Sequence, residues 1–232
     1  LPNIHKANTE VLKNEIKGFI EQIVNAVLQF YEIELTRKDI KRDLMVNMIT
    51  NIVIREDIYF ILFRIYSKML NDDIQKMHTV LSSDYAQEHM ISLASRNVER
   101  QFRMDQAFRE EFPLKEGKQE SIVPGRAYDS IITRMRLLDE MESPMLKCEH
   151  IYKCCTEEIL KTLEEFWAAR EIKRGKLVIG FDNLEGIVIY MLGQMKDMPQ
   201  VLTHLALTDA FLPEKISQTD RKFYFVMMQS SC

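Results

Sequence analysis

Residues 9–30 read TEVLKNEIKGFIEQIVNAVLQF, and this stretch decides the fold class. Its apolar residues recur every three or four positions between Leu12 and Phe30, which places them on one face of an α-helix. Thr9 can cap the start of that helix, because its hydroxyl can accept a hydrogen bond from an amide of the first turn. The sequence therefore predicts a long amphipathic helix that begins at Thr9.

Helical spacing continues through the rest of the chain. Thr36 followed by Asp39 resembles a capping box that opens a second helix, and no segment keeps the alternation of a β-strand. Pro144 and Pro199 fall at first-turn positions, where a missing amide hydrogen costs little. Further helices are expected at roughly residues 58–69, 74–81, 84–108, 127–141, 144–167, 183–194, 199–207 and 220–229. The predicted fold class is all-α.

The chain of 232 residues is predicted to form two parts. An N-terminal helical bundle is expected at residues 1–90, packed on a layered helical domain at residues 91–232. Residues 112–125 hold two prolines and two glycines, which are residues that interrupt helices. We therefore expect a long exposed connection inside the second part.

Composition excludes several classes of partner. A formal charge of −4, without a dense block of Lys and Arg, argues against binding to nucleic acid. The apolar runs are far shorter than the ~20 residues of a membrane-spanning helix, so no transmembrane segment is expected. The cysteines at 148, 154, 155 and 232 suit reduced thiols better than a disulfide framework. These features predict a cytoplasmic protein whose partner is another protein.

Two groups of residues invite a chemical interpretation. Cys148, His150, Cys154 and Cys155 are residue types that bind zinc. Neighbouring residues on a helix point about 100° apart, however, so ordinary buried thiols are the favoured interpretation. No phosphate loop and no nucleophile motif is present, and neither a cofactor nor a metal is expected. Asp182, with a glutamate three residues later, reads on its own as a helix cap.

Three segments, in order, carry a resemblance to a known family. Residues 143–154, SPMLKCEHIYKC, are similar to a helix that starts with proline and ends in a Lys-Cys pair. Residues 181–192, FDNLEGIVIYML, are similar to a signature of an aspartate followed by apolar residues and an Ile-Tyr pair. Residues 222–226, KFYFV, occupy the place of a Gly-Tyr-Tyr-Phe-Thr element. Together they resemble the Vps-nine domain of exchange factors for early-endosomal Rab GTPases, from near residue 55 to the C-terminus.

The resemblance implies a function. Residues 183–194 and 220–229 would form a groove for the switch regions of a Rab GTPase of the Rab-five subfamily. Asp182 stands where the family has a carboxylate that competes for the phosphate-loop lysine and displaces Mg²⁺. GDP would then leave without the formation of any covalent bond. The resemblance also implies association with endosomes, through regions outside this sequence.

The groove implied by the resemblance is lined by Asn183, Gly186, Phe223 and Val226, and all four depart from the family pattern. Asn183 replaces a second acidic residue, and Gly186 replaces a proline. Phe223 and Val226 replace a tyrosine and a threonine, so two hydroxyl groups are missing. Three interpretations follow: an exchange factor, a Rab-binding adaptor or scaffold with weak or no exchange activity, and an unrelated helical interaction domain.

Overall fold

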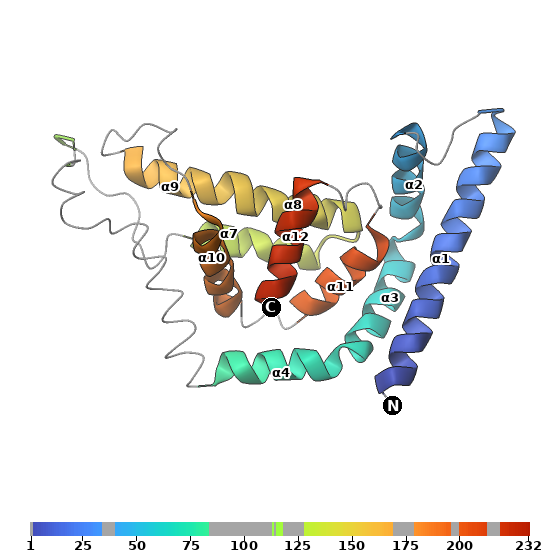
Figure 1. Ribbon diagram of the computed structural model, residues 1–232, viewed down its shortest axis with the longest axis horizontal. Helices are drawn as coiled ribbons and strands as arrows, with labels where there is room; N and C mark the ends of the chain where they lie inside the picture. The colour runs from blue at the N-terminus through green and yellow to red at the C-terminus, as the bar shows by residue number, and fades with distance from the viewer. Residues whose placement is uncertain are drawn as a thin grey trace. The chain divides into compact units, whose positions relative to one another are not determined.

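The computed structural model describes residues 2–33, 40–83, 113, 115–117, 128–168, 179–195, 200–212 and 219–232. Within these ranges every regular element is a helix, which confirms the all-α prediction (Figure 1). None of the helices in the described part of the chain is both long and apolar enough to cross a membrane.

The helices follow the predicted ranges closely. Their bounds are α1 Pro2–Phe30, α2 Ile40–Val53, α3 Glu56–Met69, α4 Asn71–Ser82, α7 Asp129–Met135, α8 Pro144–Lys153, α9 Ile159–Ala168, α10 Phe181–Gln194, α11 Val201–Phe211 and α12 Asp220–Ser231. Pro144 is the first residue of α8, as expected from its missing amide hydrogen. The predicted helix at 84–108, the capping box at Thr36 and the position of Pro199 lie outside the described residues.

Two predictions of helix bounds were wrong. Helix α1 begins at Pro2, so Thr9 lies inside the helix, where its side chain is 5 % exposed and cannot act as a cap. Proline is well suited to the first position of a helix, which explains the earlier start. The helix expected at 127–141 stops at Met135 and continues as a 3-10 turn, η3 (Arg136–Asp139). Short 3-10 segments are common at the ends of α-helices.

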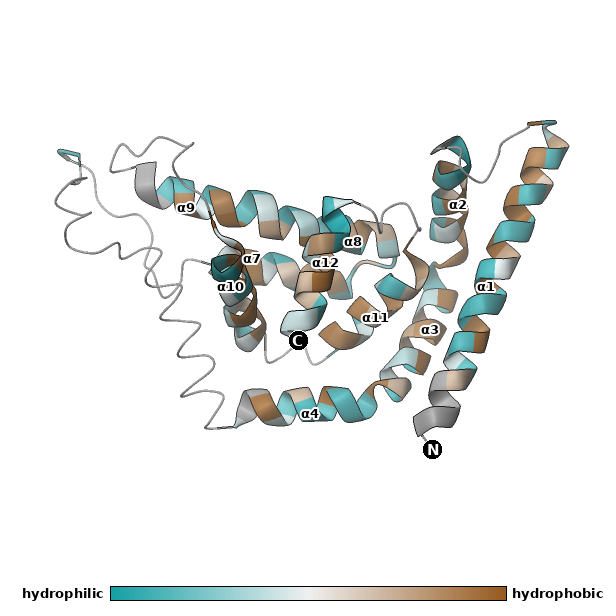
Figure 2. Cartoon of the chain, viewed as in Figure 1, coloured by the Kyte–Doolittle hydropathy of each residue, from teal (hydrophilic) through white to brown (hydrophobic). Residues whose placement is uncertain are grey.

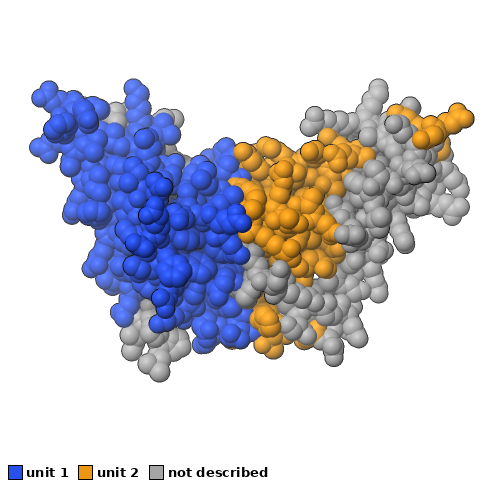
Figure 3. All heavy atoms as spheres, turned by 180° about the vertical axis from the view of Figure 1, so that it is seen from behind, with its two compact units in different colours: residues 1–75, 138–149, 200–225 blue, residues 76–137, 150–199, 226–232 orange. Residues whose placement is uncertain are grey.

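The described chain divides into two compact units (Figure 3). Unit 1 contains residues 1–75, 138–149 and 200–225, and unit 2 contains residues 76–137, 150–199 and 226–232. Unit 1 therefore combines the N-terminal helices with two later segments, a grouping that the sequence did not predict. The predicted boundary at residue 90 lies outside the described residues and stays a prediction.

Unit 1 has its core where α1 packs on α2 and on α3, and where α3 packs on α11. Alternating brown and teal sectors along α1 in Figure 2 trace the apolar and polar faces of that helix. Two clusters of buried side chains fill the core. The first joins α1 to α2 through Ile20, Val24, Leu28 and Ile49, and the second joins α3 to α11 through Tyr59, Leu62, Tyr66, Leu207, Ala210 and Phe211.

A buried arginine with two exposed partners also ties the first two helices together. Arg42 of α2 is almost fully buried, and its guanidinium pairs with Glu21 and donates to Asn25 Oδ1 at 3.0 Å, both on α1. A buried charge is tolerated only with such partners, because leaving it unpaired would cost several kcal/mol. This ion pair therefore fixes the register of α2 on α1.

In unit 2, α7 packs against a π-helical turn, η4 (Cys154–Glu158), that joins α8 to α9. The amide of Ile159 donates to the carbonyl of Cys154, five residues earlier, which is the hydrogen bond of a π-helix. Arg134 of α7 pairs with Glu158 at 2.7 Å and accepts a hydrogen bond from His150 Nε2 on its backbone oxygen at 2.8 Å. Helix α10 adds Ile187, Val188 and Met191 to the buried side chains.

Candidate functional site

The first turn of α10 presents the predicted carboxylate. Gly180, with an extended backbone, occupies the N-cap position and makes no side-chain cap hydrogen bond. Asp182 is therefore the second residue of the helix, and the interpretation of Asp182 as the cap was wrong. Glycine can take the cap position at little cost, which explains the shift. The carboxylate of Asp182 is instead an exposed group in the first turn, where the positive end of the helix dipole stabilises negative charge.

Exposure changes sharply along α10. Phe181, Asp182 and Asn183 are exposed, with Phe181 at 49 %, whereas Leu184 and Gly186 are buried. Most of the helix beyond the first turn is buried as well, through Ile187, Val188, Tyr190, Met191 and Leu192. The first turn of α10 thus exposes three successive side chains, one apolar, one acidic and one amide, whereas most of the later residues of the helix are buried. The role of Gly186 in lining a groove stays a prediction.

Helix α12 exposes the other two predicted residues. Phe223 is 51 % exposed and Val226 is 45 % exposed, while Phe225 between them is completely buried. The ring of Phe223 meets that of Tyr224 edge-on, at a centroid distance of 5.2 Å that is typical of such pairs. Phe223 belongs to unit 1, and Val226 belongs to unit 2 together with Asp182. The groove between α10 and α12 stays a prediction.

Two ion pairs hold the first turn of α12 within unit 1. Arg221 Nε lies 2.5 Å from Glu149 Oε2 of α8, and Lys222 pairs with Asp209 of α11. The ammonium of Lys222 also lies 5.0 Å above the ring of Phe225. Phe223 therefore follows two residues, Arg221 and Lys222, that are paired with acidic residues of α8 and α11.

A buried polar cluster in unit 1 was missed by the sequence analysis. It consists of the buried residues Tyr59 on α3, Lys147 on α8 and His204 on α11, together with Asp139 on η3, whose side chain is 55 % exposed. Lys147 is 1 % exposed and His204 is 3 % exposed. Lys147 Nζ lies 2.5 Å from the Leu138 carbonyl and 2.5 Å from His204 Nδ1. Tyr59 Oη lies 3.0 Å from the same nitrogen, and His204 Nε2 lies 2.6 Å from Asp139 Oδ1.

The contacts of His204 assign its tautomer. Nε2 faces a carboxylate oxygen and so carries the hydrogen, whereas Nδ1 faces two donors, Lys147 and Tyr59, and so accepts. Burial, followed by the charge of Lys147, lowers the pKa of His204 from its ordinary value, although Asp139 opposes the shift. Burial lowers the pKa of Lys147 to about 7, again against the pull of Asp139. Burial also raises the pKa of Tyr59. The neutral imidazole therefore links three segments of unit 1.

The sequence carries two signals for this cluster. Lys147 lies in the segment 143–154 that resembles the Vps-nine family, and His204 interrupts the apolar run of α11. A charged or polar residue inside an apolar run is expected to find a buried partner. Neither signal names that partner, because Lys147 and His204 are 57 positions apart and Tyr59 and His204 are 145 apart.

The four residues considered for zinc make other contacts in the structure. In unit 1, the thiol of Cys148 lies 4.0 Å from the Arg221 carbonyl. In unit 2, Cys154 Sγ lies 3.8 Å from His150 Nε2, and that nitrogen already donates to Arg134. Burial raises the pKa of the thiols, to about 11 for Cys154 and about 12 for Cys155. Among the described residues no group of three or more ligands has the geometry to hold a metal ion.

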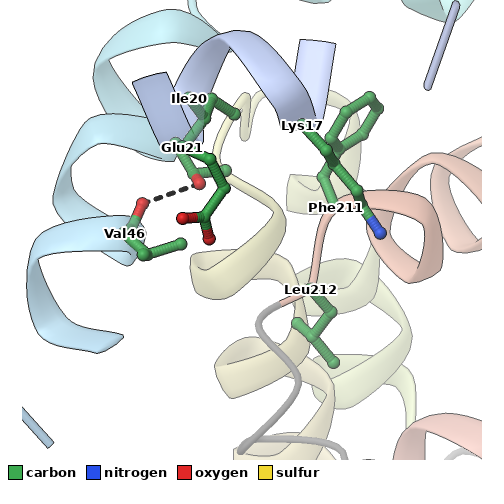
Figure 4. A pocket seen from close by; sticks show the side chains of 7 residues that line it. Lys17, Ile20, Glu21, Val46, Phe211 and Leu212 are labelled. Atoms are coloured by element: carbon green, nitrogen blue, oxygen red, sulfur yellow. Dashed lines mark hydrogen bonds between the residues drawn. The ribbon is translucent and has the colours of Figure 1, made fainter. Parts of the chain in front are cut away.

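Unit 1 also contains a small pocket of about 200 Å³ between α1, α2 and the end of α11 (Figure 4). Its lining residues are Lys17, Ile20, Glu21, Val46, Thr50, Phe211 and Leu212. Glu21 is engaged by Arg42, and the Thr50 hydroxyl donates to the Val46 carbonyl at 2.7 Å. These groups serve the packing of α1 on α2, and they do not indicate a particular ligand.

No protein-family model, curated protein or solved structure matches the chain. The interpretation of the site therefore rests on its residues and on the resemblance of the three segments.

Proposed function

We propose that the chain is a guanine-nucleotide exchange factor for a Rab GTPase of the Rab-five subfamily, with Asp182 as the acting carboxylate. The observation that supports this proposal is the exposed triplet of Phe181, Asp182 and Asn183 at the start of an otherwise largely buried helix. A carboxylate in this position can insert into a binding site on a partner protein while the rest of the helix stays in the core.

The chemistry required is electrostatic. A GTPase holds GDP through a phosphate-loop lysine and through Mg²⁺, both of which neutralise phosphate charge. A carboxylate brought beside that lysine competes with the phosphates for it and repels them, and it also disturbs the metal site. GDP then dissociates faster, and no bond in the nucleotide is broken.

The environment of Asp182 suits this role in two ways. Its place in the first turn of α10 lets the helix dipole stabilise the charge before a partner binds. The buried residues that follow, such as Ile187 and Met191, fix the helix, so little conformational entropy is lost when the carboxylate engages. Phe181 beside it supplies exposed apolar surface of the kind found at the centre of protein interfaces.

A second candidate function is an adaptor that binds the Rab GTPase with weak or no exchange activity. It is favoured by the exposed side chains of Phe223 and Val226, which offer apolar contact surface but no hydroxyl group. Such a surface can bind switch regions by burial of apolar area while lacking part of the polar contacts expected in the groove.

The experiment is release of a fluorescent GDP analogue from purified Rab GTPases, including the whole Rab-five subfamily, with wild type and three variants. Asp182→Ala and Asp182→Asn are expected to reduce acceleration to the intrinsic rate, because both remove the charge. Asp72→Ala is the matched control, since Asp72 is also an exposed acid in the first turn of a helix, α4.

The outcomes separate the candidates. Acceleration by wild type and Asp72→Ala alone supports exchange through Asp182. Acceleration that survives in both Asp182 variants removes this mechanism. If no Rab is accelerated, capture of nucleotide-free Rab by the wild-type chain supports the adaptor, and failure of capture leaves neither candidate standing.

A further inference from the structure

The first turn of α12 carries two cations where a helix favours anions. Asp220 opens the helix, and Arg221 and Lys222 follow it directly. The amide hydrogens of a first turn give it a partial positive charge, so Asp220 is stabilised there and the two cations are destabilised. The local sequence therefore weakens the turn that leads into the exposed side chain of Phe223.

Each of these cations is paired with an acid on another helix of unit 1. Arg221 Nε lies 2.5 Å from Glu149 Oε2 of α8, and Lys222 pairs with Asp209 of α11. The four side chains are between 21 % and 46 % exposed, so water screens the two pairs only in part. The two acids thus offset the unfavourable charge and attach the turn to α8 and α11.

Further contacts hold α12 on its buried side. The ring of Phe225 is completely buried, and the ammonium of Lys222 lies 5.0 Å from its centroid. The thiol of Cys148, next to Glu149 on α8, lies 4.0 Å from the carbonyl oxygen of Arg221. Because Phe225 is anchored in the core, loss of the ion pairs should loosen the first turn and leave the rest of the helix in place.

We propose that Glu149 and Asp209 are positioning residues for Phe223, because their charges keep the first turn of α12 helical. The role of Phe223 rests on the proposed function, in which its ring contacts the switch regions of the Rab GTPase. Binding to a ring that is already ordered costs less conformational entropy than binding that must first order the turn. The two acids therefore act on affinity for the Rab GTPase, whereas the rate of GDP release from the bound Rab depends on Asp182.

The first arm of the test needs no partner protein. In an α-helix the amide of Tyr224 donates to the carbonyl of Asp220, so its hydrogen exchange reports the order of the first turn. This exchange is measured by nuclear magnetic resonance on the full chain. The double variant Glu149→Gln with Asp209→Asn should exchange the Tyr224 amide about tenfold faster, since each partly exposed pair contributes a factor of about three.

The second arm measures the affinity of the full chain for nucleotide-free Rab GTPases of the Rab-five subfamily. The double variant should bind about tenfold more weakly than wild type, while GDP release at saturating concentrations of the chain should stay within about twofold. Glu158→Gln is the matched control, because Glu158 is 23 % exposed and pairs with Arg134 at 2.7 Å, but in unit 2. Unchanged circular dichroism and urea midpoints establish that the rest of the fold is intact.

A charge reversal separates positioning from direct contact with the Rab GTPase. Glu149→Lys places a second cation beside Arg221 and should weaken Rab binding more than Glu149→Gln does. Adding Arg221→Glu restores a pair of opposite charges, and the affinity should return to within about threefold of wild type. If Arg221 contacted the Rab directly, the second change would weaken binding further.

Three results would overturn the positioning role. They are unchanged exchange of the Tyr224 amide in the double variant, faster exchange with unchanged Rab affinity, and failure of the charge reversal to restore binding. A wild-type chain that neither binds nor accelerates any Rab would overturn the proposed function, and the role of Phe223 with it. The two failures are distinguishable, because amide exchange is measured on the chain alone.

Discussion

Lys147 Nζ and His204 Nδ1 lie 2.5 Å apart in the interior of unit 1. Two basic groups at this distance cannot both carry a proton cheaply, because like charges in a buried site repel strongly. The arrangement works with a neutral imidazole that accepts from Lys147 and donates to Asp139. The positive charge of this cluster thus lies on Lys147, whose ammonium donates to the Leu138 carbonyl and to His204 Nδ1.

The first prediction concerns the pH dependence of stability. The pKa of His204 is lowered in the folded chain, so the unfolded chain binds a proton more readily below about pH 6.5. The free energy of unfolding should therefore fall as the pH falls below that value. The pKa of Lys147 is lowered to about 7, so stability should rise as the pH increases from 7 to about 8, below the range in which the thiols of the unfolded chain ionise. Urea unfolding at several pH values measures both arms.

A lysine variant assigns the alkaline arm of this curve. Lys147→Met removes the titrating group while keeping a side chain of similar length, and the rise above pH 7 should flatten. Lys153→Met, on the exposed side of the same helix, should leave the rise intact. A rise that persists in Lys147→Met would mean that another group titrates.

The second prediction concerns the attachment of α2 to α1. Arg42→Met removes a guanidinium that pairs with Glu21 and Asn25 and should lower the free energy of unfolding by about 2 kcal/mol. Glu21→Gln should cost less than about 1 kcal/mol, since the Glu21 side chain is 48 % exposed and water can replace part of the interaction. If Arg42→Met and Glu21→Gln lower the free energy of unfolding equally in urea, the bond from Arg42 to Asn25 and the burial of Arg42 contribute little to stability.

The third prediction concerns the exchange rate. Phe223→Tyr restores a phenolic hydroxyl on an exposed ring of α12 and should raise the rate of GDP release severalfold, because one added hydrogen bond is worth about 1 kcal/mol. Tyr224→Phe removes the hydroxyl next to it and serves as the comparison. An unchanged rate in Phe223→Tyr, with the fold intact, would show that the missing hydroxyl does not limit exchange.

The fourth prediction concerns the cysteines. Burial raises the pKa of Cys148 and Cys154 to about 11 and that of Cys155 to about 12, so little thiolate forms at pH 8. These thiols should react with an aromatic disulfide reagent far more slowly in the native chain than in urea. Fast reaction of all three in the native chain would contradict their burial.

Helical periodicity predicted most of the described secondary structure. The ranges expected for α3, α10 and α12 agree with the observed bounds to within a few residues, because each has a regular pattern of apolar positions. The start of α1 was missed, since residues 2–8 are mostly polar and lack the apolar spacing that indicates a helix. Local pattern predicts an element well but places its ends poorly.

The site was predictable only in part. Asp182 was selected on the resemblance of residues 181–192, its side chain is exposed, and its functional role stays a prediction. The cap interpretation failed because a glycine can occupy the cap position without any side-chain signal. The buried polar cluster depends on residues from four separate segments, and a single sequence does not show which of them meet.

The π-helical turn at Cys154–Glu158 acts as a change of phase in the long helix from Pro144 to Ala168. In an uninterrupted α-helix, Cys154 and Leu163 would point in opposite directions, because nine residues turn through about 900°. Both are buried, since the wider turn delays the rotation by about one residue. Removal of one residue from this turn would therefore convert it to ordinary α-helix and leave the buried face of α9 where it is, because eight residues of regular α-helix turn through the same ~800°. Natural sequences that lack that residue could keep the same apolar pattern after it.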